Sequence, residues 1–149
     1  ERMQIACYAD FCNECGNCDT FCPEYGGPYI QKPSFFGTIE SWTRAAPRDG
    51  FVVEAHAAGD RIQGRIRGAI FQLYIMHDRT NLFVDNVIAA VLEAERHELI
   101  SVKRLEKLSA DYRIDMGVYH TLRYLLGGVS DQSCVNQVNA RTFAVGVTT

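Results

Sequence analysis

The feature that most constrains this chain is a run of closely spaced cysteines near its amino end, which we term the motif cysteines. They follow the pattern C-x2-C-x2-C-x3-C and are Cys12, Cys15, Cys18 and Cys22. Two-residue spacings let a looping backbone curl around one side of a compact inorganic cluster, and Gly16 permits close approach and unusual φ. Pro23 turns the chain away after the fourth thiol. The run predicts that all four cysteines ligate an iron–sulfur cluster of the [4Fe–4S] type.

Two other uses of clustered cysteines are a zinc site and a disulfide framework. Zinc sites usually pair two C-x2-C knuckles across a long gap, or combine one knuckle with two histidines, and no histidine follows the run closely. Disulfide frameworks belong to small secreted domains, and the amino end has no charged segment followed by an apolar run. Both points favour an iron–sulfur cluster over a zinc site or a disulfide framework.

The number of clusters stays open at this point. In two-cluster ferredoxins the fourth cysteine of each run ligates the other cluster. Either Cys22 closes the same cluster, or it belongs to a second cluster whose remaining ligands lie upstream. The chain starts at Glu1 rather than at Met, so we expect it to be a piece of a longer polypeptide.

A competing register uses the two cysteines outside the run. Cys7, Cys12 and Cys15 match the plant-type [2Fe–2S] spacing, and Cys134 would supply a remote fourth thiolate. This register leaves the rest of the run and its following proline unexplained. We otherwise expect Cys7 to be a buried core cysteine beside the loop, and Cys134 to be a buried core cysteine too, since free cysteine is commonly buried.

Residues around the run resemble one known family. Tyr8–Glu24 is followed by Gly26–Tyr29, by Lys32-Pro33 and by Phe35-Phe36. Over about residues 5–42 this pattern resembles the C-terminal part of the putative selenate reductase subunit family. Its members are large FAD- and NAD(P)-linked oxidoreductases, similar to the glutamate synthase small chain, with bacterial-type [4Fe–4S] ferredoxin motifs.

The resemblance implies electron transfer within a larger, cytoplasmic oxidoreductase. It carries over the four motif cysteines as ligands, whereas FAD and NAD(P) are implied only for an upstream part. Implied partners are the rest of the polypeptide or complex, with molybdenum-hydroxylase-type subunits among the candidates. The alternative is a structural cluster or docking domain that assembles a multi-subunit oxidoreductase without cycling its own redox state. We identify no bond-breaking residues, because the histidines are dispersed; they are His56, His77, His97 and His120.

Charge and composition exclude two classes of partner. The net charge of -3 and the pI near 5.8 lack the basic footprint of a nucleic-acid-binding protein. The most apolar stretches, 68–76 and 82–92, are interrupted by polar residues and are too short to span a bilayer. Four acidic residues around the run are expected to form a solvated rim; they are Asp10, Glu14, Asp19 and Glu24.

The fold class that we expect is α+β. Residues 1–36 are predicted to form a partial ferredoxin-like [4Fe–4S] module, and residues 37–149 a small α+β domain with a flexible C-terminal tail. Turn signals between apolar stretches predict a β-meander with strands over 51–56, 61–67 and 69–77.

Periodicity gives further local predictions. In 61–67, Ile62 and Ile66 should face the core, while the intervening arginines and Gln63 face water. The spacing of apolar residues predicts helices over 82–98 and 116–126, with a strand running into a helix as the rival over 82–98. We expect Gly127-Gly128 to end the second helix and Gly26–Pro28 to be a non-helical turn.

Overall fold

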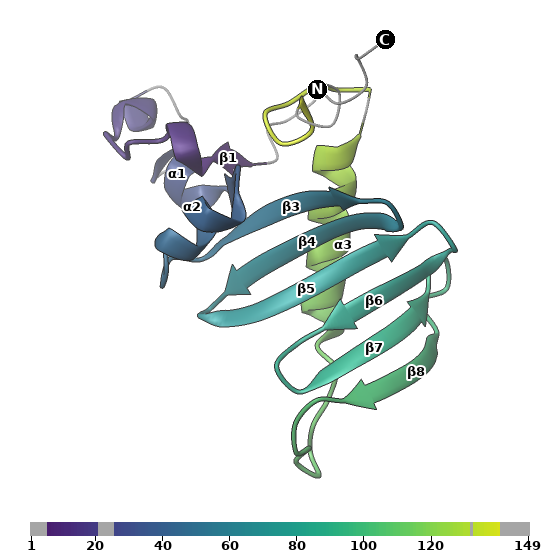
Figure 1. Ribbon diagram of the computed structural model, residues 1–149. Helices are drawn as coiled ribbons and strands as arrows, with labels where there is room; N and C mark the ends of the chain where they lie inside the picture. The colour runs from purple at the N-terminus through teal and green to yellow at the C-terminus, as the bar shows by residue number, and fades with distance from the viewer. Residues whose placement is uncertain (1–5, 21–25, 132, 141–149) are drawn as a thin grey trace.

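A computed structural model of the chain describes residues 6–20, 26–131 and 133–140. One mixed sheet of eight strands dominates the molecule, with strands in sequential order from β1 to β8 (Figure 1). The predicted α+β class is confirmed at this level, as mixed sheet and helix. The strands are β1 (Cys7–Tyr8), β2 (Ser34–Phe36), β3 (Gly50–His56), β4 (Gly59–Ile66), β5 (Ala69–Met76), β6 (Thr80–Val84), β7 (Ile88–Glu93) and β8 (Leu99–Arg104).

Among the described residues, one helix is long and the others are short. The short 3-10 turns are η1 (Ala9–Phe11) and η2 (Asn17–Thr20), and the α-helices are α1 (Gly27–Gln31), α2 (Ile39–Arg44) and α3 (Met116–Ser130). Figure 1 shows α3 crossing one face of the sheet behind β3, β4 and β5. Within the described ranges, no helix has the length and apolar character needed to cross a bilayer.

The amino-terminal strands belong to the same sheet as the rest. The strands from β3 to β8 form an antiparallel meander, whereas β1 pairs with β2 and β2 with β3 in parallel. Cys7 is opposite Ser34, and Phe35 is opposite Phe51. The described residues do not show a separate ferredoxin-like module, and the division at residue 37 stays a prediction.

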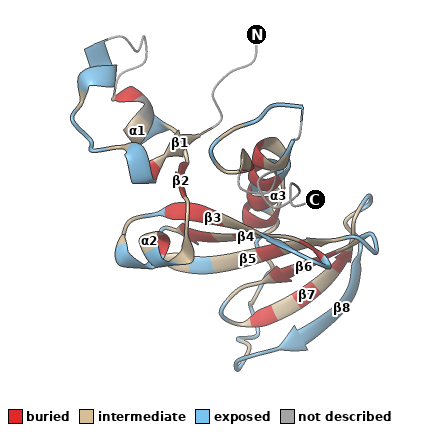
Figure 2. Cartoon of the chain, turned by 45° about the horizontal axis from the view of Figure 1, so that its top comes forward, coloured by how far each residue is buried: buried red, intermediate tan, exposed pale blue. Residues whose placement is uncertain are grey.

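The two faces of β2 and β3 contribute side chains to two different hydrophobic cores. Successive strand residues point to opposite faces. Phe35 and Phe51 therefore join the large core between the sheet and α3, where they are buried with Leu122. Their neighbours Phe36 and Val52 join a smaller core with Trp42 of α2. Figure 2 shows buried residues on α3 and on the strands that it covers, whereas β8 is exposed along its whole length.

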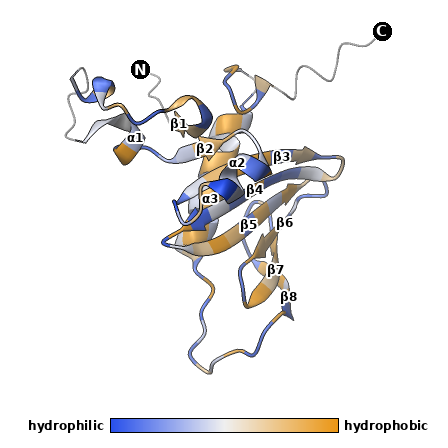
Figure 3. Ribbon diagram, turned by 60° about the vertical axis from the view of Figure 1, so that its left-hand side comes forward, coloured by the Kyte–Doolittle hydropathy of each residue, from blue (hydrophilic) through white to orange (hydrophobic). Residues whose placement is uncertain are grey.

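Helix α3 extends further than the sequence indicates. Asp115 caps it, because its carboxylate accepts a hydrogen bond from the Val118 N–H at 3.0 Å. The apolar face continues past the predicted end through Leu126 to Val129, packed against the sheet (Figure 3). The prediction that Gly127-Gly128 ends the helix is wrong, since burial of this continuing face outweighs the low helix propensity of glycine.

The helix predicted over 82–98 is also wrong, because this segment forms parts of β6 and β7. Asp85 starts a tight turn, and its carboxylate accepts hydrogen bonds from the N–H groups of Val87 and Ile88 at 2.7 and 2.8 Å. Burial in β7 alternates strictly between buried and half-buried residues. The β-branched residues here favour this pleated surface over a helix.

The prediction of a non-helical turn at Gly26–Pro28 is only partly confirmed. Gly26 and Gly27 adopt positive φ values of 100° and 62°, which glycine accepts without strain. A short helix, α1, nevertheless begins at Gly27. Proline is tolerated in the first turn of a helix, where its missing N–H has no intrahelical partner, so Pro28 does not prevent it.

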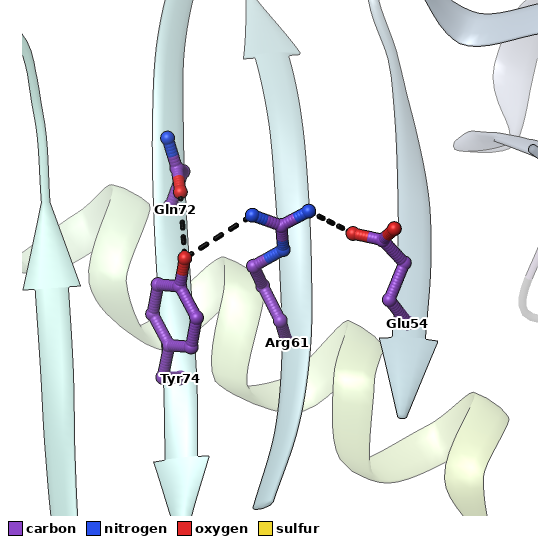
Figure 4. Close-up of polar contacts among 4 residues, drawn as sticks. All are labelled: Glu54, Arg61, Gln72 and Tyr74. Carbon is purple, nitrogen blue, oxygen red and sulfur yellow. Dashed lines mark hydrogen bonds and ion pairs between the residues drawn. The ribbon is translucent and has the colours of Figure 1, made fainter. Parts of the chain in front are cut away.

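The predicted strand over 61–67 is confirmed, but one arginine that was predicted to face water does not. Arg65 is buried, with its guanidinium carbon 4.3 Å from the centroid of the Trp42 ring. Arg61 lies on the face away from α3 and is half-buried rather than fully exposed to water. There it pairs with Glu54 and donates to the Tyr74 hydroxyl at 3.1 Å (Figure 4).

Candidate metal centre

The ligand loop, residues 12–20, connects η1 to the segment before α1 and carries three of the motif cysteines. Cys12 is half-buried, and Cys15 and Cys18 are exposed; all three are free thiols. Cys22 lies outside the described residues. The structure thus places three predicted ligands on one short, surface-facing loop.

Local turns give this loop its sharp curvature. The Cys15 N–H donates to the Asn13 side-chain oxygen at 3.2 Å, and the Asp19 N–H donates to the Gly16 carbonyl at 2.9 Å. Glu14 and Gly16 have φ values of 55° and 77°, in the left-handed region. Such a backbone can wrap around a bound group, as the cysteine spacing predicts.

Cys7 approaches the loop from β1. Its backbone N–H donates to the Pro33 carbonyl at 2.9 Å, within the parallel pair β1–β2. Burial raises the pKa of the Cys7 thiol, and the neighbouring Cys12 raises it further. Cys7 is half-buried, whereas we expected a fully buried core cysteine beside the loop.

Cys134 is exposed, which contradicts the expectation that it is buried. It nevertheless shares a cavity of about 360 Å³ with Cys7, beside the end of α3. Aromatic and aliphatic side chains from β1, β2 and α3 line the cavity; among them are Tyr8, Phe35 and Val129.

Two carboxylates of the expected acidic rim hold the loop to the sheet instead of merely facing solvent. Asp10 accepts hydrogen bonds from the Gly37 N–H at 3.0 Å and from the Ser41 hydroxyl at 3.4 Å. Glu14 forms an ion pair with Arg48. These contacts join the loop to the start of α2 and to the turn before β3.

Arg48 is a residue of the site that the sequence did not single out. Besides pairing with Glu14, it donates from Nη2 to the Ser34 hydroxyl at 3.4 Å, and its carbonyl accepts from Arg65 at 2.6 Å. The sequence assigns Arg48 only to a turn. No spacing signal links it to the cysteine run, because the two meet through strand pairing across the sheet.

A second polar cluster lies at the other end of the molecule. The Asn81 amide donates to the Tyr119 hydroxyl at 2.8 Å, and that oxygen lies 2.9 Å from Nδ1 of His97. The His97 and His120 rings are 5.1 Å apart between centroids. Two histidines expected to be dispersed are therefore neighbours, and this cluster ties the β7–β8 turn to α3.

The donor chemistry of the ligand loop fits an iron–sulfur cluster, because soft thiolates are the ligands that such clusters take. In residues 6–20, 26–131 and 133–140, no three histidine, cysteine, aspartate or glutamate side chains are placed to hold a metal ion. Three of the motif thiols therefore lie on one loop, but the described side chains are not arranged to hold a metal ion.

Comparison with known proteins shows a partial similarity to an oxidoreductase. No protein-family model matches the chain, and no solved structure matches it. Over 53 residues, which are 36% of this chain, it is 43% identical to "Putative oxidoreductase YgfK" of Escherichia coli strain K12. The protein of that name from Escherichia coli O157:H7 gives the same identity over the same length. The match spans 5% of each relative, so part of this chain is related to a small portion of a far longer oxidoreductase.

Proposed function

We propose that this chain is the iron–sulfur, electron-transfer portion of a larger flavin-dependent oxidoreductase. The observation that carries the proposal is the run Cys12, Cys15, Cys18, Cys22 with Pro23 directly after it, the bacterial spacing for cluster ligands. Partial identity to an oxidoreductase supports the same reaction class. This protein would thus resemble the putative selenate reductase subunit family in its electron-carrying part.

Each part of the site has a defined task in this proposal. Cys12, Cys15 and Cys18 bind as thiolates, and Cys22 supplies a further thiolate to the same cluster or to a second one. A bound [4Fe–4S] cluster would supply reversible one-electron chemistry. Arg48 and Glu14 fix the loop and set the charge around it, which is one of the levers on reduction potential.

The remaining cofactors and partners belong to other parts of the enzyme. FAD and NAD(P) are expected on the upstream polypeptide, since this chain has no nucleotide-binding motif. Partners are the rest of that polypeptide or complex, with molybdenum-hydroxylase-type subunits as candidates. In this arrangement the exposed side of the ligand loop, at Cys15 and Cys18, faces the neighbouring electron carrier.

Iron analysis of cysteine variants tests the proposal. The whole chain is prepared anaerobically, and iron, acid-labile sulfide and visible absorption are measured. We expect Cys15→Ala to lose most of the bound iron, because it removes a predicted ligand. The matched control Cys134→Ala should keep the wild-type iron content. A colourless wild-type protein that holds only zinc would contradict the proposal.

Reduction with dithionite separates electron transfer from a purely structural role. An electron-transfer cluster should give a reversible EPR signal on reduction and lose it on reoxidation. A cluster that only staples the fold, or a docking domain without redox cycling, would give no such signal. The second result would replace the electron-transfer proposal with the structural alternative.

A further inference from the structure

We infer that β8 is a dimer interface, at which its free edge pairs in antiparallel orientation with β8 of a second copy of this chain. The inference goes beyond the proposed function and involves none of the motif cysteines. β1 and β8 are the two ends of the sheet, so this edge and the ligand loop lie at opposite ends of the strand order.

The backbone of β8 offers hydrogen-bonding groups to a further strand. In the described part of the chain β8 pairs with β7 alone, and Figure 1 shows it at the outer edge of the meander. Just after β8, the Leu105 N–H donates to the Val87 carbonyl at 2.9 Å. Because backbone groups alternate in direction along a strand, those of Val102 and Arg104 should point away from β7. The register shift between the two strands lies opposite the start of β8, so its carboxyl half keeps a regular edge.

Side chains on and just after β8 form an exposed apolar strip. Leu99, Ile100, Val102 and Leu105 are between 43% and 57% exposed. Val102 is opposite Ala90, which is buried in the large core between the sheet and α3. Opposite residues share a face, so Val102 continues that core to the edge of the sheet, where water reaches it. A further strand would cover it, and the burial of apolar surface favours that pairing.

Two-fold symmetry restricts how two copies of β8 can pair. Opposite residues in an antiparallel pair share a face, so one residue at the two-fold axis must lie opposite its own copy. With Ser101 at the axis, Ile100 lies opposite Val102 of the second copy, and the two apolar side chains meet. The same register sets Glu98 opposite Arg104, so opposite charges meet at each end of the paired segment.

Charge favours this register over its neighbours. Beyond the strand ends it also sets Arg96 opposite Glu106. Moving the axis one residue toward the carboxyl end would set Glu98 opposite Glu106, and moving it one residue toward the amino end would set Arg96 opposite Arg104. Like charges directly opposite each other are destabilising. The segment is therefore complementary to itself about Ser101, which assigns the edge to a second copy of this chain.

Sedimentation velocity of the whole chain tests the inference. We expect a dimer at micromolar concentration that dissociates on dilution. Reductant is present throughout, because exposed thiols would otherwise cross-link two copies. Val102→Lys should raise the dissociation constant about tenfold or more, since a charge in the middle of an edge strand opposes further pairing. Val135→Lys is the matched control, because Val135 is 69% exposed and lies after α3; it should leave the dissociation constant unchanged.

Charge reversal tests the register. Glu98→Arg places like charges opposite each other at both ends of the interface and should raise the dissociation constant about tenfold. Arg104→Glu should have a similar effect. The combined variant Glu98→Arg/Arg104→Glu restores opposite charges at both ends, and its dissociation constant should return to the wild-type value. The combined exchange leaves the composition and net charge of the chain unchanged.

Amide hydrogen exchange locates the contact on the dimer. The Val102 N–H should exchange more slowly in the dimer than after dilution, because a second strand accepts its hydrogen bond. Amides within α3 should exchange at the same rate in both states. Circular dichroism checks that each variant is folded.

Three results would overturn the inference. The first is a wild-type chain that is monomeric at every concentration, which would leave the edge to another segment of the larger polypeptide. The second is a folded Val102→Lys variant that dimerises as tightly as Val135→Lys. The third is a combined charge exchange that stays as weak as either single reversal, which would refute pairing about Ser101.

Discussion

Tyr119 is a single side chain on which three elements converge. It is fully buried, accepts a hydrogen bond from Asn81 of β6, and lies 2.9 Å from His97 in the β7–β8 turn. Burial and nearby Arg123 lower the pKa of His97, so its neutral ring can accept a hydrogen bond from the phenol. The hydroxyl therefore satisfies two polar groups at once.

Removing this hydroxyl should destabilise the protein without changing its fold. Tyr119→Phe keeps the buried ring but leaves the Asn81 amide unpaired, at a cost of about 1–3 kcal/mol in the free energy of unfolding. Urea denaturation followed by circular dichroism measures the change. Tyr124→Phe on the same helix is the control, because Tyr124 is 70% exposed. Equal stability of the two variants would contradict a structural role for the Tyr119 hydroxyl.

Individual site residues differ in how well the sequence predicts them. The motif cysteines are recognisable because their spacing is local. Arg48 and Arg65 are not, because their contacts depend on segments that are distant in sequence. Arg65 shows the reason: a period-2 pattern places it on the polar face, and the pattern carries no information that Trp42 covers that face.

At the scale of elements, helix α3 and the β-hairpins show where local signals succeed. The β3, β4 and β5 strands were predictable because short turns separate alternating or β-branched stretches. The segment containing β6 and β7 was not, because Val84, Val87, Ile88 and Val91 fit a helical rhythm as well as a pair of strands. The Asp85-Asn86 turn and the β-branched residues favour two strands over a helix only once the neighbouring strands are present to pair with them.

Glycine substitutions distinguish the observed α3 from the shorter helix that the sequence predicts. A side chain at Gly127 would have open space around it, and its φ is not positive. Gly127→Ala should therefore raise the free energy of unfolding by about 0.5–1 kcal/mol, through better helix propensity. Thermal and urea unfolding measure the change.

Gly68→Ala is the matched control for this experiment. Gly68 also has open space, but its φ of 78° disfavours a side chain. We expect that variant to be destabilised. A loss of stability in Gly127→Ala would indicate that the glycine ends the helix in a left-handed conformation, as the sequence predicted.

At the scale of the whole molecule, the ligand loop and the meander share one hydrogen-bonded sheet. The parallel pairs β1–β2 and β2–β3 join them, and contacts from Asp10 and Glu14 reinforce the connection. Parallel pairing joins strands far apart in sequence, so no local pattern predicts it. The sequence could therefore place the cysteines along the chain but not the surface on which they rest.

The smaller core described above gives this protein a built-in optical reporter. Trp42 is the sole tryptophan, and it packs in the same core as Ala9, the residue that begins the turn leading to Cys12. Iron–sulfur chromophores absorb broadly across the range in which indole emits, so a cluster on the neighbouring loop should quench its fluorescence by energy transfer. Emission should fall as wild-type protein takes up iron and sulfide, and stay bright in Cys15→Ala under the same titration. Assembly could then be followed in real time without any added dye.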